Sequence, residues 1–108
     1  MRHVLFVCSQ NHCRSVTAEL VFRNYHPEIW VRSCGIDSSA TVPFSTALGM
    51  WADLIICFEQ MHVKAVKDEI GDLHDDDNIV CLGIPDSYNA MDPELVAMLK
   101  ARVPEFLR

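Results

Sequence analysis

The sequence predicts an α/β fold: a single three-layer domain in which a four-stranded parallel sheet carries helices on both faces. Its 108 residues suffice for one domain with one core. Half of the residues are hydrophobic and 22% are charged, which is typical of a chain that buries its core without disulfides or metals. Short β-rich runs alternate with helical patterns, as in parallel strands joined by helices. We therefore expect residues 1–108 to form one domain with one site.

The predicted strands are near-continuous apolar runs rather than alternating ones, which favours strands that are buried on both faces. They span residues 3–7, 29–33, 53–58 and 78–82. Residues 34–50 fit this scheme worst, because serines, a proline and a glycine interrupt them. We interpret them as a loop with one or two turns, next to which residues 44–51 can form a short helix.

Two predicted helices connect successive strands, and a third follows the last strand. Residues 15–25 place apolar side chains on one face and end before a proline. Residues 59–70 repeat apolar residues at helical spacing and stop at Gly71. Asp92 is the predicted N-cap of the last helix, with proline at its first position, and Pro104 ends this helix.

Charge and cysteine content narrow the class of protein. Nine basic and fifteen acidic residues give a net charge of -6, the wrong sign for a nucleic-acid surface, so local geometry must hold any bound anion. Five cysteines are an odd number and lack the spacing of a zinc site, which indicates a reducing compartment and no metal or cofactor. The apolar residues 4–7 are too few for a signal peptide, and no apolar run reaches 18 residues. We expect a soluble cytoplasmic protein without membrane contact.

The most informative stretch is the turn that follows the first predicted strand and leads into a helix. Cys8 stands at the carboxyl end of this strand, where an open α/β sheet has its ligand crevice. The turn can aim several backbone N–H groups at one tetrahedral oxyanion. A helix N-terminus and a guanidinium also favour the thiolate form of cysteine, which is the nucleophile. Cys8 and Arg14 therefore form a candidate nucleophile and oxyanion clamp.

Two polar residues of this stretch have both a functional and a structural interpretation. Ser15 can donate its hydroxyl proton to the Cys8 thiolate or merely cap the helix. Asn11 can hold the loop in shape, because asparagine tolerates left-handed turns and forms local hydrogen bonds, or it can serve as a cap.

Six further residues are expected in the core and carry no assigned chemistry: His3, Trp30, Cys34, Trp51, Cys57 and Cys81.

The sequence resembles the low-molecular-weight protein tyrosine phosphatases, and more closely the short bacterial members of that superfamily. The resemblance rests on the Cys-x5-Arg-Ser loop of residues 8–15 and on four further segments. These segments are residues 17–19, 33–35, 52–55 and 85–88. The resemblance covers nearly the whole chain and implies the strand order 2-1-3-4.

The resemblance implies a phosphocysteine mechanism without a cofactor. Cys8 attacks phosphorus, Arg14 and the loop amides bind the phosphate oxygens, and Asp86 protonates the leaving group. Tyr88 is expected to stack on a phenyl ring of the substrate. The other substrate-binding residues implied are Ser9, Gln10, Asn11, His12, Cys13 and Ser15. The expected partners are a phosphorylated protein or a small aryl phosphate as substrate, and inorganic phosphate or other oxyanions as inhibitors.

Three residues and one short segment qualify what the resemblance implies. Ser87 follows Asp86 where the family has proline, and the Asp-Pro pair occurs at Asp92, a rival acid that its N-cap position already explains. Cys13 matches a second family cysteine that can form a protective disulfide with Cys8, or is merely a small loop side chain. His12 either lines the mouth of the site or faces water. The short segment between strands two and three affects phosphotyrosine specificity more than phosphate binding.

Other functions use a similar loop. An arsenate reductase of related fold needs a further cysteine to pass its disulfide outward, and Cys81 is the only late candidate. A sugar-phosphotransferase carrier domain stores phosphate on a loop cysteine, where Arg14 and Asp86 would promote its loss. A non-catalytic phosphoanion-binding module would keep the loop without a competent acid.

Overall fold

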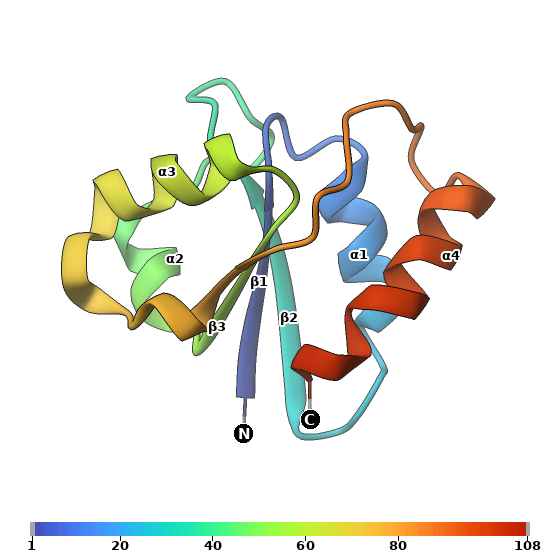
Figure 1. The fold of residues 1–108 in the computed structure, drawn as a ribbon, viewed down its shortest axis with the longest axis horizontal. Coiled ribbons are helices and arrows are strands. Elements are labelled where there is room, and N and C mark those ends of the chain that lie inside the picture. The colour runs from blue at the N-terminus through green and yellow to red at the C-terminus, as the bar shows by residue number, and fades with distance from the viewer. Residues whose placement is uncertain (1, 108) are drawn as a thin grey trace.

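The computed structural model describes residues 2–107 and places four parallel strands in one sheet (Figure 1). The strands are β1 (Arg2–Cys8), β2 (Ile29–Gly35), β3 (Leu54–Cys57) and β4 (Ile79–Cys81). Their order is β2-β1-β3-β4, so the predicted order is confirmed. Strand order reverses at β1, because β2 and β3 pair with its opposite edges. The carboxyl end of β1 is therefore where a crevice is expected.

Helices cover both faces of the sheet, which confirms the predicted layers (Figure 1). One face carries α1 (Arg14–Phe22) and α4 (Pro93–Arg102), and the other carries α2 (Thr46–Trp51) and α3 (Gln60–Ile70). The helix α1 ends three residues earlier than predicted. The short helix expected within residues 44–51 is α2. Three single turns of 3-10 helix are Gly71–Leu73, Asp76–Asn78 and Pro104–Phe106.

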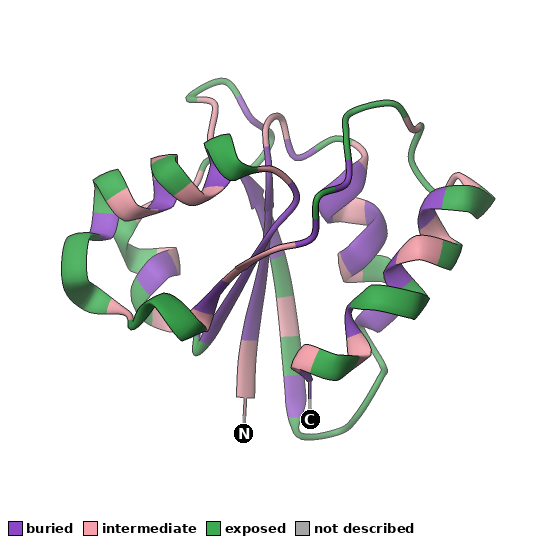
Figure 2. Ribbon diagram, viewed as in Figure 1, coloured by how far each residue is buried: buried purple, intermediate pink, exposed green. Residues whose placement is uncertain are grey.

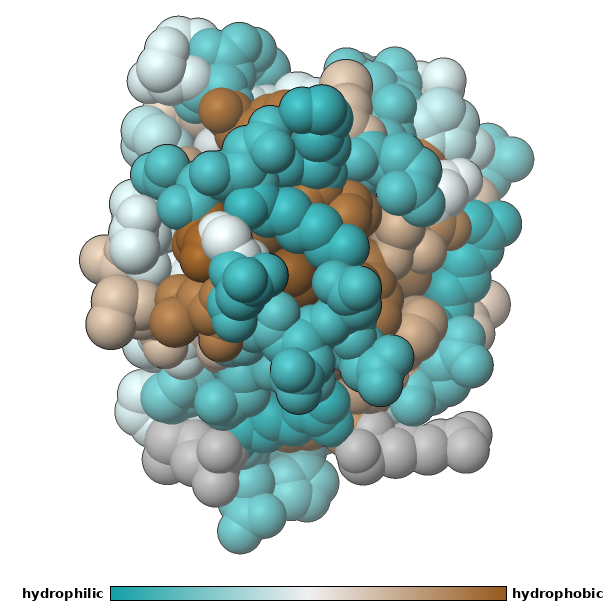
Figure 3. All heavy atoms as spheres, turned by 60° about the vertical axis from the view of Figure 1, so that its left-hand side comes forward, coloured by the Kyte–Doolittle hydropathy of each residue, from teal (hydrophilic) through white to brown (hydrophobic). Residues whose placement is uncertain are grey.

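Successive residues of β1 point to opposite faces and supply both halves of the core. Figure 2 shows this strand as buried beyond its first residues. Val4, Phe6 and Cys8 pack on the side of α1 and α4. Leu5 and Val7 pack on the side of α2 and α3. The outer surface on the α2 and α3 side is mostly hydrophilic, with hydrophobic side chains visible between polar ones (Figure 3). β1 is thus buried over residues 4–8, and it presents its last residue, Cys8, at the carboxyl edge of the sheet.

The expected core residues divide into two groups. Cys34 and Cys57 are fully buried, as predicted. Burial, and secondarily the nearby Cys8, raises the pKa of the Cys34 thiol to about 12, so this thiol stays protonated. The prediction for Trp30 is wrong: its side chain is 54% exposed, because β2 is an edge strand and Trp30 lies near its start. The remaining three, His3, Trp51 and Cys81, are half-buried.

Candidate active site

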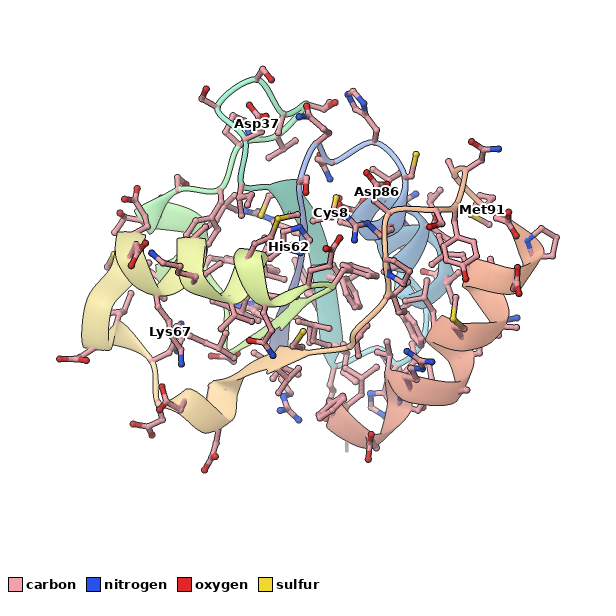
Figure 4. The ribbon with its side chains drawn as sticks, turned by 45° about the horizontal axis from the view of Figure 1, so that its top comes forward. Cys8, Asp37, His62, Lys67, Asp86 and Met91 are labelled. Carbon is pink, nitrogen blue, oxygen red and sulfur yellow. The ribbon has the colours of Figure 1, made fainter. Side chains whose placement is uncertain are left out.

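Cys8 lies where β1 turns into the loop before α1, and its side chain is 3% exposed (Figure 4). Its sulfur accepts a hydrogen bond from the backbone N–H of Asn11 at 3.2 Å. The Ser15 hydroxyl lies 2.9 Å from the same sulfur. Asn11 reaches this position through a left-handed backbone with φ 57°, a conformation that asparagine adopts more readily than most residues.

The Ser15 hydroxyl belongs to a chain of side-chain hydrogen bonds behind the loop. The Asn11 amide donates one proton to Ser15 Oγ at 2.8 Å and another to Ser33 Oγ at 3.0 Å. The Ser33 hydroxyl in turn donates a hydrogen bond to the carboxylate of Glu19 at 2.8 Å. Because Ser15 Oγ accepts from Asn11, its own proton is available for donation to the Cys8 sulfur. This network supports the loop-shaping role of Asn11 and places the Ser15 hydroxyl against the Cys8 sulfur, whereas the N-cap position of α1 is Cys13.

The loop backbone is oriented by residues 36–41, which are part of the segment, residues 34–50, that fitted the sequence pattern worst. The carbonyl oxygens of Cys8, Ser9 and Gln10 accept hydrogen bonds of 2.9, 3.0 and 3.2 Å from backbone N–H groups of residues 36, 37 and 41. A trans peptide places its N–H opposite its carbonyl, so the N–H groups of residues 9–11 turn away from this segment. The N–H of Asn11 indeed points at the Cys8 sulfur. The result is the amide nest that the sequence predicted at this turn.

Gly35 at the end of β2 allows this close approach. A Cβ atom at this position would lie 2.4 Å from the carbonyl oxygen of Ser9 and 2.8 Å from the backbone nitrogen of Asn11. Both are backbone atoms of the loop, which cannot withdraw as a flexible side chain would. Glycine is therefore required here because the loop backbone occupies the space of a side chain.

Arg14 is 2% exposed, and its charge is compensated by groups from distant parts of the chain. Its Nη1 donates to the carboxylate of Glu59 and, at 2.9 Å, to the carbonyl of Ile84. Its Nε lies 3.9 Å from Asp86 Oδ1, and its guanidinium carbon lies 5.8 Å from the centre of the Phe58 ring. Both hydrogen bonds use Nη1, so the edge formed by Nε and Nη2 is the one suited to hold two anion oxygens.

The N-terminus of α3 reaches the same loop through His62. Glu59 is the N-cap of α3, and its backbone N–H donates to His62 Nδ1 at 3.0 Å. The other ring nitrogen, Nε2, lies 2.9 Å from Ser9 Oγ. The imidazole is fully buried, and burial, with the Arg14 charge as a second cause, lowers the pKa of His62 to about 4. His62 is therefore neutral at physiological pH.

A cavity of about 140 Å³ opens beside these groups, a size suited to one small anion. Its walls come from the loop and from the segment after β4: Cys8, Ser9, Gln10, His12, Cys13, Arg14 and Asp86. Asn11 and Ser15 lie beneath the loop and support it, rather than lining the cavity. His12 is exposed at the mouth of the cavity, where its side chain both lines the site and faces water. Tyr88 is half-buried against the core on the α1 and α4 side and is absent from the cavity wall.

The candidate acid Asp86 stands on a loop that is fixed to α1 on both sides of it. Arg14 binds the carbonyl of Ile84, and the N–H of Met91 donates to the buried Thr17 hydroxyl at 2.9 Å. Between these anchors Asp86 is 68% exposed and points toward Cys8 and His62 (Figure 4). Its rival, Asp92, accepts a hydrogen bond from the N–H of Glu94 at 2.9 Å and so caps α4.

Sequence reasoning missed the residues that support the loop from other elements. These are Glu19, Ser33, Gly35, Glu59 and His62. Two signals were present: Glu19, Ser33 and Gly35 lie in segments that carry the resemblance, and Glu59 follows a buried strand at the same sheet edge as Cys8, where a charged residue is a candidate for the site. Among residues 2–107, no group of three or more His, Cys, Asp or Glu side chains is arranged to hold a metal ion. Within the same residues, no helix is both long and apolar enough to cross a membrane.

Solved structures define the class of fold. A low molecular weight protein tyrosine phosphatase from Streptococcus pyogenes superposes with a TM-score of 0.79 at 20% identity, covering 99% of this chain and 91% of that one. The tyrosine phosphatase Wzb from Escherichia coli K30, in complex with phosphate, has a TM-score of 0.76 at 21% identity, covering 96% and 94%. The YwlE arginine phosphatase from Geobacillus stearothermophilus has a TM-score of 0.75 at 18% identity, covering 99% and 93%. The chain thus has the low molecular weight phosphatase fold.

Sequence similarity to known proteins is found in the N-terminal part of the chain. The family described as low molecular weight phosphotyrosine protein phosphatase matches residues 3–43. Wzb from Escherichia coli K12 is 50% identical over 34 residues, which are 32% of this chain and 23% of that protein. The matched part therefore spans about a quarter of the length of this curated relative. The fold and the N-terminal sequence are both similar to those of low molecular weight phosphotyrosine phosphatases, which confirms the predicted resemblance.

Proposed function

We propose that this protein is a cysteine-dependent phosphomonoester hydrolase, a protein tyrosine phosphatase that acts through a phosphocysteine intermediate on Cys8. One observation carries the proposal. A buried sulfur accepts hydrogen bonds at the floor of a cavity whose wall also contains Arg14 and Asp86. A nucleophile, an oxyanion clamp and an acid thus surround one space of phosphate size. The phosphate bound to the related Wzb structure supports the same ligand class.

The first step transfers the phosphoryl group to sulfur. The Cys8 thiolate attacks phosphorus, so the S–P bond forms while the P–O bond to the leaving group breaks. The N–H groups of residues 9 and 10 and the Nε–Nη2 edge of Arg14 bind the three remaining oxygens, which gain charge in the transition state. Asp86, in its protonated form, gives its proton to the leaving oxygen. The product that departs is a neutral phenol.

The second step regenerates the enzyme. Asp86, now a carboxylate, takes a proton from a water molecule, whose oxygen attacks phosphorus. The P–S bond breaks, inorganic phosphate leaves and Cys8 returns to its thiolate. Ser15 lowers the energy of this step, because its hydroxyl proton stabilises the departing sulfur anion. No metal or cofactor takes part in either step.

The decisive experiment measures hydrolysis of aryl phosphates by wild type and Cys8→Ser. We expect activity in the wild type, inhibition by vanadate and loss of activity in Cys8→Ser. Cys81→Ser, on β4, is the matched control and should stay active. An active Cys8→Ser variant would contradict the proposed nucleophile.

The role of Asp86 is tested with two leaving groups. Asp86→Asn should slow release of a poor leaving group such as phenol by about 10²–10⁴-fold, and release of a good one such as nitrophenol by much less. Asp92→Asn keeps a good helix cap and should leave both rates unchanged. Equal effects of Asp86→Asn on the two substrates would refute its role as the acid.

Substrate choice and competing functions are decided with the same protein. Because one structural neighbour is described as an arginine phosphatase, phosphoarginine and phosphotyrosine peptides should be compared at equal concentration. Arsenate-dependent oxidation of a thiol reductant would instead indicate an arsenate reductase. Arg14-dependent phosphate binding without hydrolysis would indicate a binding module.

All five cysteines are free thiols, which supports a reducing compartment such as the cytoplasm.

A further inference from the structure

The contact between Ser9 and His62 joins the first residue after the nucleophile to a fully buried imidazole on α3. Ser9 Oγ and His62 Nε2 lie 2.9 Å apart, although the two residues are 53 positions apart in the sequence. Ser9 also lines the cavity that contains Cys8. A polar side chain with no exposure needs partners for both ring nitrogens, so this placement is specific.

The second contact of the imidazole determines which nitrogen carries the proton. The backbone N–H of Glu59 donates to His62 Nδ1 at 3.0 Å, so Nδ1 must be the unprotonated acceptor. In the neutral ring the single proton is then on Nε2, which donates to Ser9 Oγ. This tautomer prevents His62 from acting as a base toward Ser9. The pair is therefore a fixed donor arrangement and not a second nucleophilic dyad.

The hydrogen bond from His62 restricts the direction of the Ser9 hydroxyl proton. Because Ser9 Oγ already accepts from His62, its own O–H is directed away from the imidazole. Ser9 is one of the residues that line the cavity together with Cys8 and Arg14, so its hydroxyl is close to the space that an anion would occupy. A hydroxyl fixed in this way adds one side-chain donor to the backbone amides and Arg14, and fixed donors bind a charged ligand better than mobile ones.

We propose that the Ser9 hydroxyl is a direct ligand of the phosphoryl oxygens and that His62 is the positioning residue that orients it. This role deepens, and rests on, the phosphate chemistry proposed above. His62 also caps the helix whose N-cap, Glu59, holds Arg14, so one imidazole connects two sides of the anion site. It thereby sets the relative position of the hydroxyl and the guanidinium.

Variants of the two residues separate orientation from simple packing. Asparagine at position 62 can replace Nδ1 as acceptor for the Glu59 N–H but lacks the distal donor. Glutamine places an N–H near the position of Nε2. His62→Asn and Ser9→Ala should each weaken binding of inorganic phosphate about tenfold, measured by calorimetry. His62→Gln and Ser9→Thr, which retain the donor and the hydroxyl, should bind within about threefold of wild type.

The double variant gives the sharper readout. If His62 acts through Ser9, His62→Asn together with Ser9→Ala should bind phosphate no more weakly than either single variant. Losses that multiply in the double variant, or phosphate affinity unchanged in Ser9→Ala, would overturn the proposal. The exposed His26→Gln serves as the control for loss of a histidine. Should His62→Asn fail to fold, the Ser9→Ala and Ser9→Thr comparison still decides the question.

The outcomes also distinguish this proposal from the proposed function. Ser9-dependent phosphate binding in a wild type that hydrolyses nothing supports the role of Ser9 and refutes the phosphatase. Hydrolysis by the wild type, with phosphate affinity unchanged in Ser9→Ala, supports the phosphatase and refutes the role of Ser9. A nitrogen NMR spectrum of His62 that shows the proton on Nδ1 would also overturn the proposal, since Nε2 could then not donate.

Discussion

Replacing His62 with asparagine should change how the stability of the protein depends on pH. The fold buries the imidazole completely, and burial lowers the pKa of His62 from 6.5 to about 4. The Arg14 charge acts in the same direction, while the carboxylates of Glu59 and Asp86 oppose it. Between these two pH values the unfolded chain binds a proton that the folded chain does not. The free energy of unfolding is thus highest above pH 6.5 and falls as the pH decreases toward 4.

The magnitude follows from the two pKa values. Each pKa unit corresponds to about 1.4 kcal/mol, so complete titration from pH 6.5 to 4 costs about 3 kcal/mol. Between pH 7.5 and pH 5 the same two values give a loss of about 2 kcal/mol. This loss is a large fraction of the net stability of a small domain.

Urea unfolding at pH 7.5, 6 and 5 measures this loss directly. Wild type should lose about 2 kcal/mol more than His62→Asn over this range, because asparagine does not titrate. The exposed His26→Gln should follow the wild-type curve, which separates the burial of one histidine from the presence of any histidine. Parallel curves for wild type and His62→Asn would refute the reasoning, whatever their absolute stabilities.

Three further predictions concern the loop. Gly35→Ala should destabilise the fold by about 1–3 kcal/mol in urea unfolding and abolish phosphate binding, because the added Cβ would lie 2.4 Å from the loop backbone. Normal phosphate binding by this variant would show that the loop can shift. Asn11→Gly keeps the left-handed backbone but removes the amide, so it should cost about 1–3 kcal/mol of stability, and an unchanged midpoint would contradict the hydrogen-bond network. If Cys13 protects Cys8 by forming a disulfide, Cys13→Ser should make peroxide inactivation irreversible by dithiothreitol; equal recovery in both proteins would leave Cys13 as a loop side chain.

Local patterns were enough to predict the architecture. Apolar runs defined the strands, and the Asp-Pro signal placed the N-cap of α4, because such features involve neighbours in the chain. The prediction failed for Trp30, since whether a strand lies at the edge or the centre of a sheet is not a local property. Likewise, residues 36–41 carried no periodic signal, because three of their backbone N–H groups donate to the Cys8 loop rather than within a helix or strand.

The sequence by itself determined the nucleophile and its clamp, because Cys8 and Arg14 lie within one turn at the end of a recognisable strand. Only the tertiary structure decided what orients them. Arg14 is held by Glu59 from 45 residues away, Asn11 by Ser33 from 22 residues away, and Ser9 is tied to α3. Such partners depend on the register between strands and on how helices pack across the sheet. Sequence spacing does not encode these distances, so the chemical groups were predictable and their alignment was not.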